Sequence, residues 1–89
     1  MQRLYARVEG RVQGVGFRYY AMTQAHALGL TGWVSNLPDG AVELEAQGAS
    51  DVLRQFVEFL ERGPGSSRVR GVETSPRPVD AGERGFRIR

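Results

Sequence analysis

The residues of this chain best suited to chemistry lie in one glycine-rich segment, residues 13–18. The segment contains Gly14 and Gly16, ends in Arg18, and separates a strand-like run from a helix-like run. The free backbone N–H groups and the dipole at the start of a helix attract anions. Arg18 adds a planar charged group that can contact two phosphate oxygens at once. The segment therefore predicts a phosphate site, although glycines alone more often make only a sharp strand-to-helix connection.

Three better-known kinds of phosphate site are excluded by residues that the chain lacks. All twelve basic residues are arginine, so there is no lysine for a Walker loop. Gly14 and Gly16 are not followed by the third glycine of a dinucleotide fingerprint. A cysteine phosphatase would have its nucleophile where Val12 stands, and the chain has no cysteine. Backbone N–H groups and Arg18 remain as the groups that could hold a phosphate.

Such a site suits a substrate whose bond to phosphorus breaks with little help from the protein. Phosphoryl transfer depends mainly on positioning and on stabilising charge, but the leaving group must still depart. The leaving group of an acyl phosphate is a carboxylate, a weak base that needs little protonation. The segment therefore favours acyl phosphates as substrates, with an oriented water as the only other reactant.

The elements that must position this segment follow from the spacing of apolar residues. Alternation over residues 4–8 predicts a first strand. Helical spacing over residues 17–28 predicts a helix, and Gly29 is placed to end it. Residues 32–36 and 41–47 are strand-like and flank the turn-rich tetrapeptide Leu-Pro-Asp-Gly, which predicts a hairpin.

The second half of the chain repeats the pattern of helix and strand. Ser50 is placed to cap a second helix that ends at Gly63. Residues 69–74 and 85–89 predict two further strands, and residues 75–82 are expected to form a loop. The βαββαβ order with a short last strand predicts an α+β, ferredoxin-like fold. Two helices should pack on one face of a four- to five-stranded antiparallel sheet.

Two sequence blocks resemble those of a known family. Residues 8–18, VEGRVQGVGFR, resemble the acylphosphatase signature V-x-G-x-V-Q-G-V-x-F-R at every specified position. Residues 32–36, GWVSN, followed by Asp39 and Gly40, resemble the family's second signature, in which the asparagine is catalytic. The blocks lie at the family's separation, and the resemblance covers essentially the whole chain. It implies an acylphosphatase, a hydrolase of acyl phosphates.

The resemblance also implies a role for each site residue. Arg18 and Asn36 would be the catalytic residues, with Asn36 holding the attacking water. Ser35 stands where the family has a longer, often basic residue. It should point away from the Asn36 side chain, so we expect catalysis to be retained. No metal and no cofactor are implied. Phosphate would be bound by the backbone N–H groups of six consecutive residues: Gln13, Gly14, Val15, Gly16, Phe17 and Arg18.

The composition sets the broader expectations. With 89 residues, one domain covering 1–89 is expected, because two cores would each be too small. A net charge of +2 is ordinary for a small globular domain, and the arginines are scattered. The N-terminus lacks the apolar run of a signal peptide. We expect a cytoplasmic monomer with a small-molecule acyl phosphate as substrate, inorganic phosphate as product and inhibitor, and neither nucleic acid nor a membrane as partner.

Several other polar and aromatic residues are more readily explained without chemistry. His26 is interpreted as a solvated surface histidine with no role. Asp39 is interpreted as a turn residue of the hairpin. Glu43 and Glu45, together with the arginines of the last strand, are expected on a solvated face of the sheet. Trp33 is expected to pack against other residues, not to bind a ligand.

Two alternative functions share features of this sequence. An RNA-recognition module has the same βαββαβ order, and residues 84–88, RGFRI, begin like its first signature. Arg87 and Ile88 stand where that signature needs small and aromatic residues on a central strand. A catalytically silent segment of a larger carbamoyl-transferring maturation protein is the other alternative. The length of 89 residues favours a free-standing enzyme.

Overall fold

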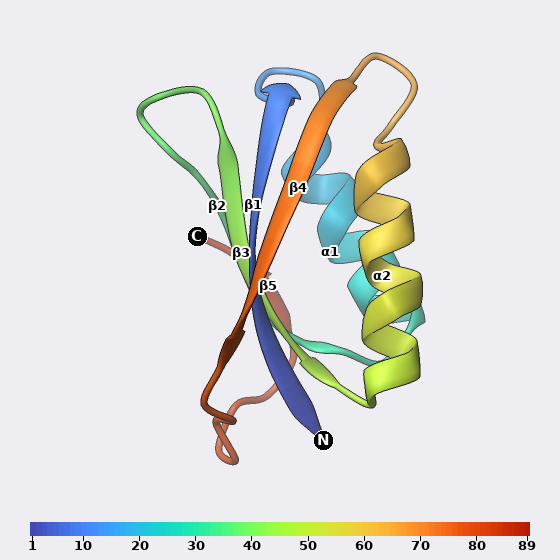
Figure 1. The fold of residues 1–89 in the computed structure, drawn as a ribbon, viewed down its shortest axis with the longest axis vertical. Coiled ribbons are helices and arrows are strands. Elements are labelled where there is room, and N and C mark those ends of the chain that lie inside the picture. The colour runs from blue at the N-terminus through green and yellow to red at the C-terminus, as the bar shows by residue number, and fades with distance from the viewer.

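The computed structural model describes all 89 residues, with two helices on one face of a five-stranded sheet (Figure 1). The α+β, ferredoxin-like fold is confirmed, with a short fifth strand at its end. None of the helices is long and apolar enough to cross a membrane. The elements in chain order are β1 (Gln2–Arg11), α1 (Phe17–Ala27), β2 (Thr31–Asn36), β3 (Val42–Gly48), α2 (Ser50–Arg62), β4 (Arg68–Arg77) and β5 (Phe86–Ile88).

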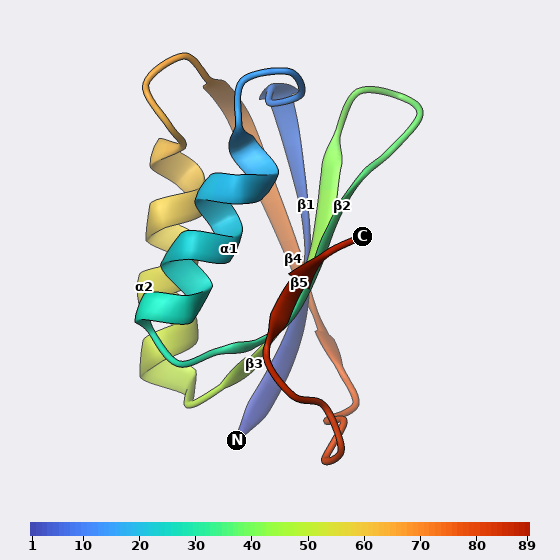
Figure 2. The same ribbon diagram turned by 180° about the vertical axis from the view of Figure 1, so that it is seen from behind.

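The strands lie side by side in the order β4-β1-β3-β2-β5. β1 is antiparallel to both β3 and β4, and β2 is antiparallel to β3. β5 pairs with β2 in parallel, with Phe86 opposite Gly32, so the sheet is mixed and not wholly antiparallel. β5 runs parallel to β2 because of the path taken by the segment between β4 and β5. This segment passes around one end of the sheet, from the edge at β4 to the edge at β2, so that β5 starts at the same end as β2 (Figure 2).

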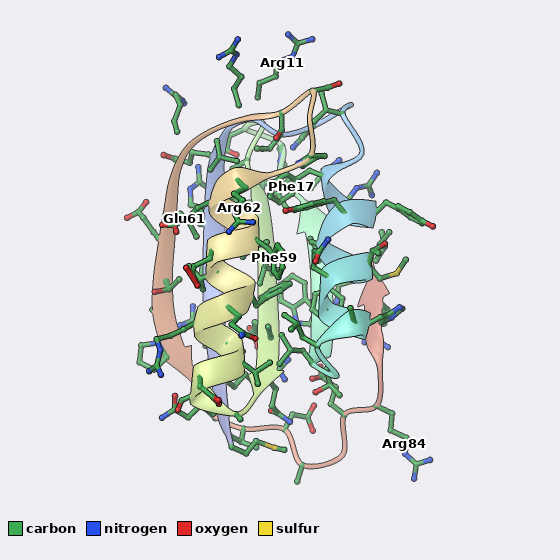
Figure 3. All side chains as sticks on the ribbon, turned by 90° about the vertical axis from the view of Figure 1, so that its right-hand side faces the viewer. Arg11, Phe17, Phe59, Glu61, Arg62 and Arg84 are labelled. Atoms are coloured by element: carbon green, nitrogen blue, oxygen red, sulfur yellow. The ribbon has the colours of Figure 1, made fainter.

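The hydrophobic core lies between the helices and the sheet. Alternation along β1 and β3 turns every second side chain toward the helices, and Leu44 in β3 is fully buried there. Phe17 is also buried, and its side chain points from the first turn of α1 toward α2 (Figure 3). Phe56 of α2 meets Phe86 of β5 edge to face, with ring centroids 6.0 Å apart. The core therefore joins both helices to the last strand.

The helix ends agree with the predicted glycines but not with the predicted cap. Gly29 has φ 70° and its N–H donates to His26 O at 3.1 Å, which confirms that it ends α1. Gly63, with φ 66°, ends α2 as predicted. The expected capping by Ser50 is wrong. Ala49 occupies the capping position in an extended conformation, so Ser50 is already helical and its side chain makes no capping hydrogen bond.

β4 is longer than its apolar pattern predicts. The interpretation of residues 75–82 as a loop is wrong for Ser75, Pro76 and Arg77, which belong to the strand. Pro76 pairs with Leu4, and Arg77 pairs with Arg3. A proline that cannot donate to a neighbouring strand is tolerated here because β4 is at the edge of the sheet.

The face of the sheet turned away from the helices carries a buried arginine. Arg3 is only 7% exposed, and its guanidinium donates to Glu45 at 2.6 Å and to both carboxylate oxygens of Glu83 at 2.6 and 2.9 Å. Hydrogen bonding to Glu83 and Glu45 raises the pKa of Arg3 above its ordinary value, and Arg3 lowers the pKa of Glu83. Gln47 exchanges two hydrogen bonds with the Asp80 backbone. These contacts hold the segment between β4 and β5 against the sheet.

The expectation that Glu43 and Glu45 lie on a solvated face of the sheet is therefore only partly correct, because both make contacts within the protein. Glu45 is bound to Arg3, and Glu43 accepts a hydrogen bond from the Tyr5 hydroxyl at 2.9 Å. The arginines of β5 and its end are exposed as predicted. The guanidinium of Arg89 lies over the ring of Trp33, 4.0 Å from its centroid. This contact covers the ring, so that Trp33 is only 8% exposed although it lies on the face turned away from the helices. Trp33 is thus a packing residue, as predicted.

Candidate active site

The glycine-rich segment connects β1 to α1 by a turn that needs glycine at two positions. Gly14 has φ 73° and Gly16 has φ 79°, whereas no residue other than glycine has a positive φ. The sign of φ therefore alternates along the segment. Such alternation turns successive N–H groups toward one concave side, where an anion can bind. A Cβ at either glycine would meet no protein atom within 4 Å, so backbone conformation, and not lack of space, requires them.

The backbone donors of this segment are unused by the rest of the protein. None of the N–H groups of residues 13–18 donates a hydrogen bond to a backbone or side-chain acceptor in the protein. The first helical bond of α1 runs from Tyr20 N–H to Gly16 O at 2.9 Å. The unpaired donors and the helix dipole act at the same place, so this end of α1 favours a negatively charged ligand.

Arg18 lies in the first turn of α1 and is half-buried. It forms no salt bridge, so its charge is not neutralised by a carboxylate of the protein. Arg18 and Asn36 both line a small pocket of about 190 Å³. No acidic residue lines this pocket, and Arg18 is its one charged residue. The complete lining is Val12, Gly14, Gly16, Phe17, Arg18, Tyr19, Asn36 and Ile88.

Asn36 is the last residue of β2, and it reaches the pocket because of the strand directions. β1 and β2 are both antiparallel to β3, so their C-terminal ends lie at the same end of the sheet. The side-chain oxygen Oδ1 of Asn36 is buried and has no hydrogen-bond partner in the protein. A buried acceptor of this kind normally has a partner, and water can provide one. The Ser35 hydroxyl donates weakly to the Asn36 carbonyl at 3.3 Å.

The hairpin between β2 and β3 lies at the same end of the molecule as the glycine-rich segment (Figure 1). The Gln13 side chain crosses between them, because its Nε2 donates to Leu37 O at 2.7 Å and to Ala41 O at 2.9 Å. Asp39 accepts the Ala41 N–H at 3.0 Å, which confirms its role in the turn. Asp39 also binds Arg7 of β1, and this guanidinium lowers the pKa of Asp39 below its ordinary value. Two side-chain contacts thus tie the hairpin to β1 and the loop.

Comparison with known proteins identifies the family. The sequence model of the acylphosphatase family matches residues 4–88. The acylphosphatase of Thermus thermophilus is 47% identical to this chain over 88 residues, which cover 99% of each sequence. The chain belongs to the acylphosphatase family.

Solved structures agree with this membership. The crystal structure of acylphosphatase from Bacillus subtilis superposes with a TM-score of 0.94 at 39% identity, covering 99% of this chain and 98% of that one. The structure of T.kodakarensis HypF superposes with a TM-score of 0.86 at 31% identity. In that case the match covers 100% of this chain and 12% of HypF. The family and its named members support an enzyme of the hydrolase class that acts on acyl phosphates.

The structure brings five of the seven expected site residues into one pocket at one end of the sheet: Gly14, Gly16, Phe17, Arg18 and Asn36. Phe17 is at the same time buried in the core, and Gln13 and Val15 do not line the pocket. The sequence did not predict three features of the site. Two are the pocket residues Tyr19 and Ile88, which are 66% and 38% exposed. The third is the pair of hydrogen bonds made by the Gln13 side chain, for which the sequence offers no local signal.

His26 and Phe86 both lie where α1 meets β5, away from the glycine-rich segment. His26 is exposed, as predicted, but its Nε2 lies 2.9 Å from Phe86 O, so it joins α1 to β5. The RNA-recognition hypothesis depended on the βαββαβ order and on residues 84–88, in which Phe86 is the aromatic residue. Phe86 is 4% exposed and packs in the core, and β5 is at the edge of the sheet. This residue therefore offers no stacking surface.

Proposed function

We propose that this chain hydrolyses the carboxyl–phosphate anhydride bond of acyl phosphates, with Arg18 binding the phosphate and Asn36 orienting the attacking water. The observation that carries the proposal is the shared pocket of Arg18 and Asn36, which come from different elements. Family membership supports the substrate class. The products are a carboxylate and inorganic phosphate.

Phosphate binding would use the backbone of residues 13–18 together with Arg18. The N–H groups of this segment make no hydrogen bond within the protein, so binding phosphate breaks no existing bond. Two of the phosphate oxygens could be contacted by the guanidinium in a fork, and the others by the loop. Because these donors are fixed by the backbone, they need little reorganisation as the charge redistributes during the reaction.

Asn36 would direct the water toward phosphorus on the side opposite the acyl group. Its buried Oδ1 can accept one hydrogen bond from that water. A neutral amide is too weak a base to remove the proton, so the proton passes to a phosphate oxygen. The water oxygen forms its bond to phosphorus as the bond to the acyl oxygen breaks, and the carboxylate leaves with that electron pair. No metal takes part in this sequence of events.

The first test is hydrolysis of benzoyl phosphate in the presence of a chelator. Wild type should be active, and Arg18→Ala should lower kcat/KM by at least about 100-fold, since two charge-assisted hydrogen bonds are lost. Arg84→Ala is the matched control, because Arg84 is exposed at the far end of the molecule from the loop (Figure 3). An inactive wild type, or full activity of Arg18→Ala, would contradict the mechanism.

The second test separates orientation of water from binding of phosphate. Asn36→Ala should lower kcat by about 100-fold, because a misplaced water reacts far more slowly. Inorganic phosphate should inhibit wild type competitively, and its inhibition constant should change by less than about threefold in Asn36→Ala. A parallel loss of turnover and of phosphate affinity would instead make Asn36 a binding residue.

A further inference from the structure

The side chain of Gln13 forms the direct link between the two halves of the site. Its Nε2 donates to the carbonyl oxygens of Leu37 and Ala41 at 2.7 and 2.9 Å. These two residues form the neck of the β2–β3 hairpin, where Leu37 N–H also donates to Ala41 O at 2.8 Å. Leu37 directly follows Asn36, and Gln13 directly precedes Gly14. The amide therefore joins the loop that would hold the phosphate to the strand end that would hold the water.

We propose that Gln13 is a positioning residue, whose side-chain amide sets the distance between Asn36 and the phosphate loop. This inference rests on the function proposed above and adds a role to a residue so far assigned only through its backbone N–H. The reacting groups of an enzyme must be placed within about half an ångström of the productive arrangement. A bridge between neighbours of the two groups controls that placement directly.

An amide is the side chain that fits this position. The –NH₂ group has two hydrogens, so it can donate to two carbonyls at the same time. A methionine has nearly the same length but no donor, and a carboxylate accepts without donating at neutral pH. The Gln13 side chain is half-buried, which limits how well water could replace its two hydrogen bonds. Loss of the donor should therefore shift the hairpin relative to the loop.

The hairpin would shift without being released. Asp39 at its tip remains bound to Arg7 of β1, and the backbone pairing of β2 with β3 is unaffected. The loop itself keeps its glycines, its N–H groups and Arg18. Loss of the Gln13 amide should consequently disturb the position of the water at Asn36 more than the binding of phosphate. The resulting loss of turnover should therefore occur only when Asn36 is present.

The experiment compares Gln13→Met with wild type, Asn36→Ala and the double variant on benzoyl phosphate. Gln13→Met should lower kcat by about 10- to 100-fold, with the phosphate inhibition constant changed less than about threefold. In the Asn36→Ala background the same substitution should change kcat by less than about twofold, because the group that it positions is absent. Gln55→Met is the matched control, since Gln55 is exposed on α2 and its side chain makes no hydrogen bond. The control should match wild type.

Each outcome has a defined meaning. Three results would overturn the inference: an unchanged kcat in Gln13→Met, an equal loss of turnover and phosphate affinity, or an equal fold-loss with and without Asn36. The proposed function would still stand if wild type is active and Arg18→Ala is impaired. An inactive wild type would overturn both. Thermal melting checks that the variant is folded. If Gln13→Met is unfolded, Gln13→Glu, which keeps the side-chain length, must show the same dependence on Asn36 for the inference to hold.

Discussion

Replacing Glu83 by glutamine tests whether the buried arginine of the sheet holds the last segment of the fold in place. Glu83 and Arg3 have side chains that are 14% and 5% exposed, and they share two hydrogen bonds of 2.6 and 2.9 Å. Glu83→Gln keeps the shape of the side chain but removes its charge. Arg3 then retains Glu45 as its charged partner.

The expected loss of stability follows from these contacts. Removing one partner of a buried ion pair costs about 3–5 kcal/mol. Because Arg3 keeps Glu45 and the glutamine oxygen still accepts one hydrogen bond, we expect about 2–3 kcal/mol. A chain of this size has an unfolding entropy of about 0.19 kcal/mol/K, so each kcal/mol lowers Tm by about 5 °C. Tm should therefore fall by about 10–15 °C.

The difference should also depend on pH in a defined direction. Arg3 lowers the pKa of Glu83 below its ordinary value of 4.5. The stabilisation is therefore fully present above the unfolded pKa, and it is lost as the pH falls through the lower folded pKa. Glu83→Gln has no such proton to bind. The gap between wild type and the variant should be constant near neutrality and narrow in acid.

Urea unfolding followed by the fluorescence of Trp33, the single tryptophan, measures this gap between pH 7 and pH 3. Glu61→Gln is the matched control, because Glu61 is exposed on α2 and forms no salt bridge (Figure 3). The control should remain within about 0.5 kcal/mol of wild type. The reasoning is refuted by a Glu83→Gln variant as stable as the control at pH 7, or by a gap that does not narrow in acid.

Two further predictions concern the core and the open face of the sheet. Phe56→Ala should destabilise the fold by about 3–5 kcal/mol, because Phe56 is fully buried against Phe86; a loss below about 1 kcal/mol in urea unfolding would contradict this packing. Burial and the hydrogen bond to Glu43 raise the pKa of Tyr5 above 10.0, so Glu43→Gln should shift one phenol to lower pH in an ultraviolet titration, and an unchanged titration would argue against the bond.

The local parts of the site could be predicted because they depend on adjacent residues. Gly14 and Gly16 indicate a backbone with positive φ, and the helical spacing after them places Arg18 in the first turn of α1. Asn36 could be placed at a strand end from the alternation before it and the turn after it. The family resemblance, carried by the same segments, supplied the role proposed for each.

The distant contacts could not be predicted because no local pattern distinguishes them. Gln13 and Leu37 are 24 residues apart, and Arg3 and Glu83 are 80 apart. Twelve arginines and ten acidic residues allow many pairings, and Arg3 stands in the same alternating pattern as arginines that are solvated. The extension of β4 through Pro76 depends on its place at the edge of the sheet, which the sequence of that segment does not reveal.

The sequence by itself determined the order of strands and helices, the glycine turn and the position of Arg18 at a helix start, because each depends on a few neighbouring residues. Only the tertiary structure decided that Asn36 would share a pocket with Arg18. That meeting requires β1 and β2 to lie on either side of β3 and antiparallel to it, so that both end at the same end of the sheet. The Gln13 amide spans the gap between the loop and the hairpin, with hydrogen bonds to Leu37 O and Ala41 O. The order of the strands, and the distance that a side chain must span between them, are properties of the folded chain.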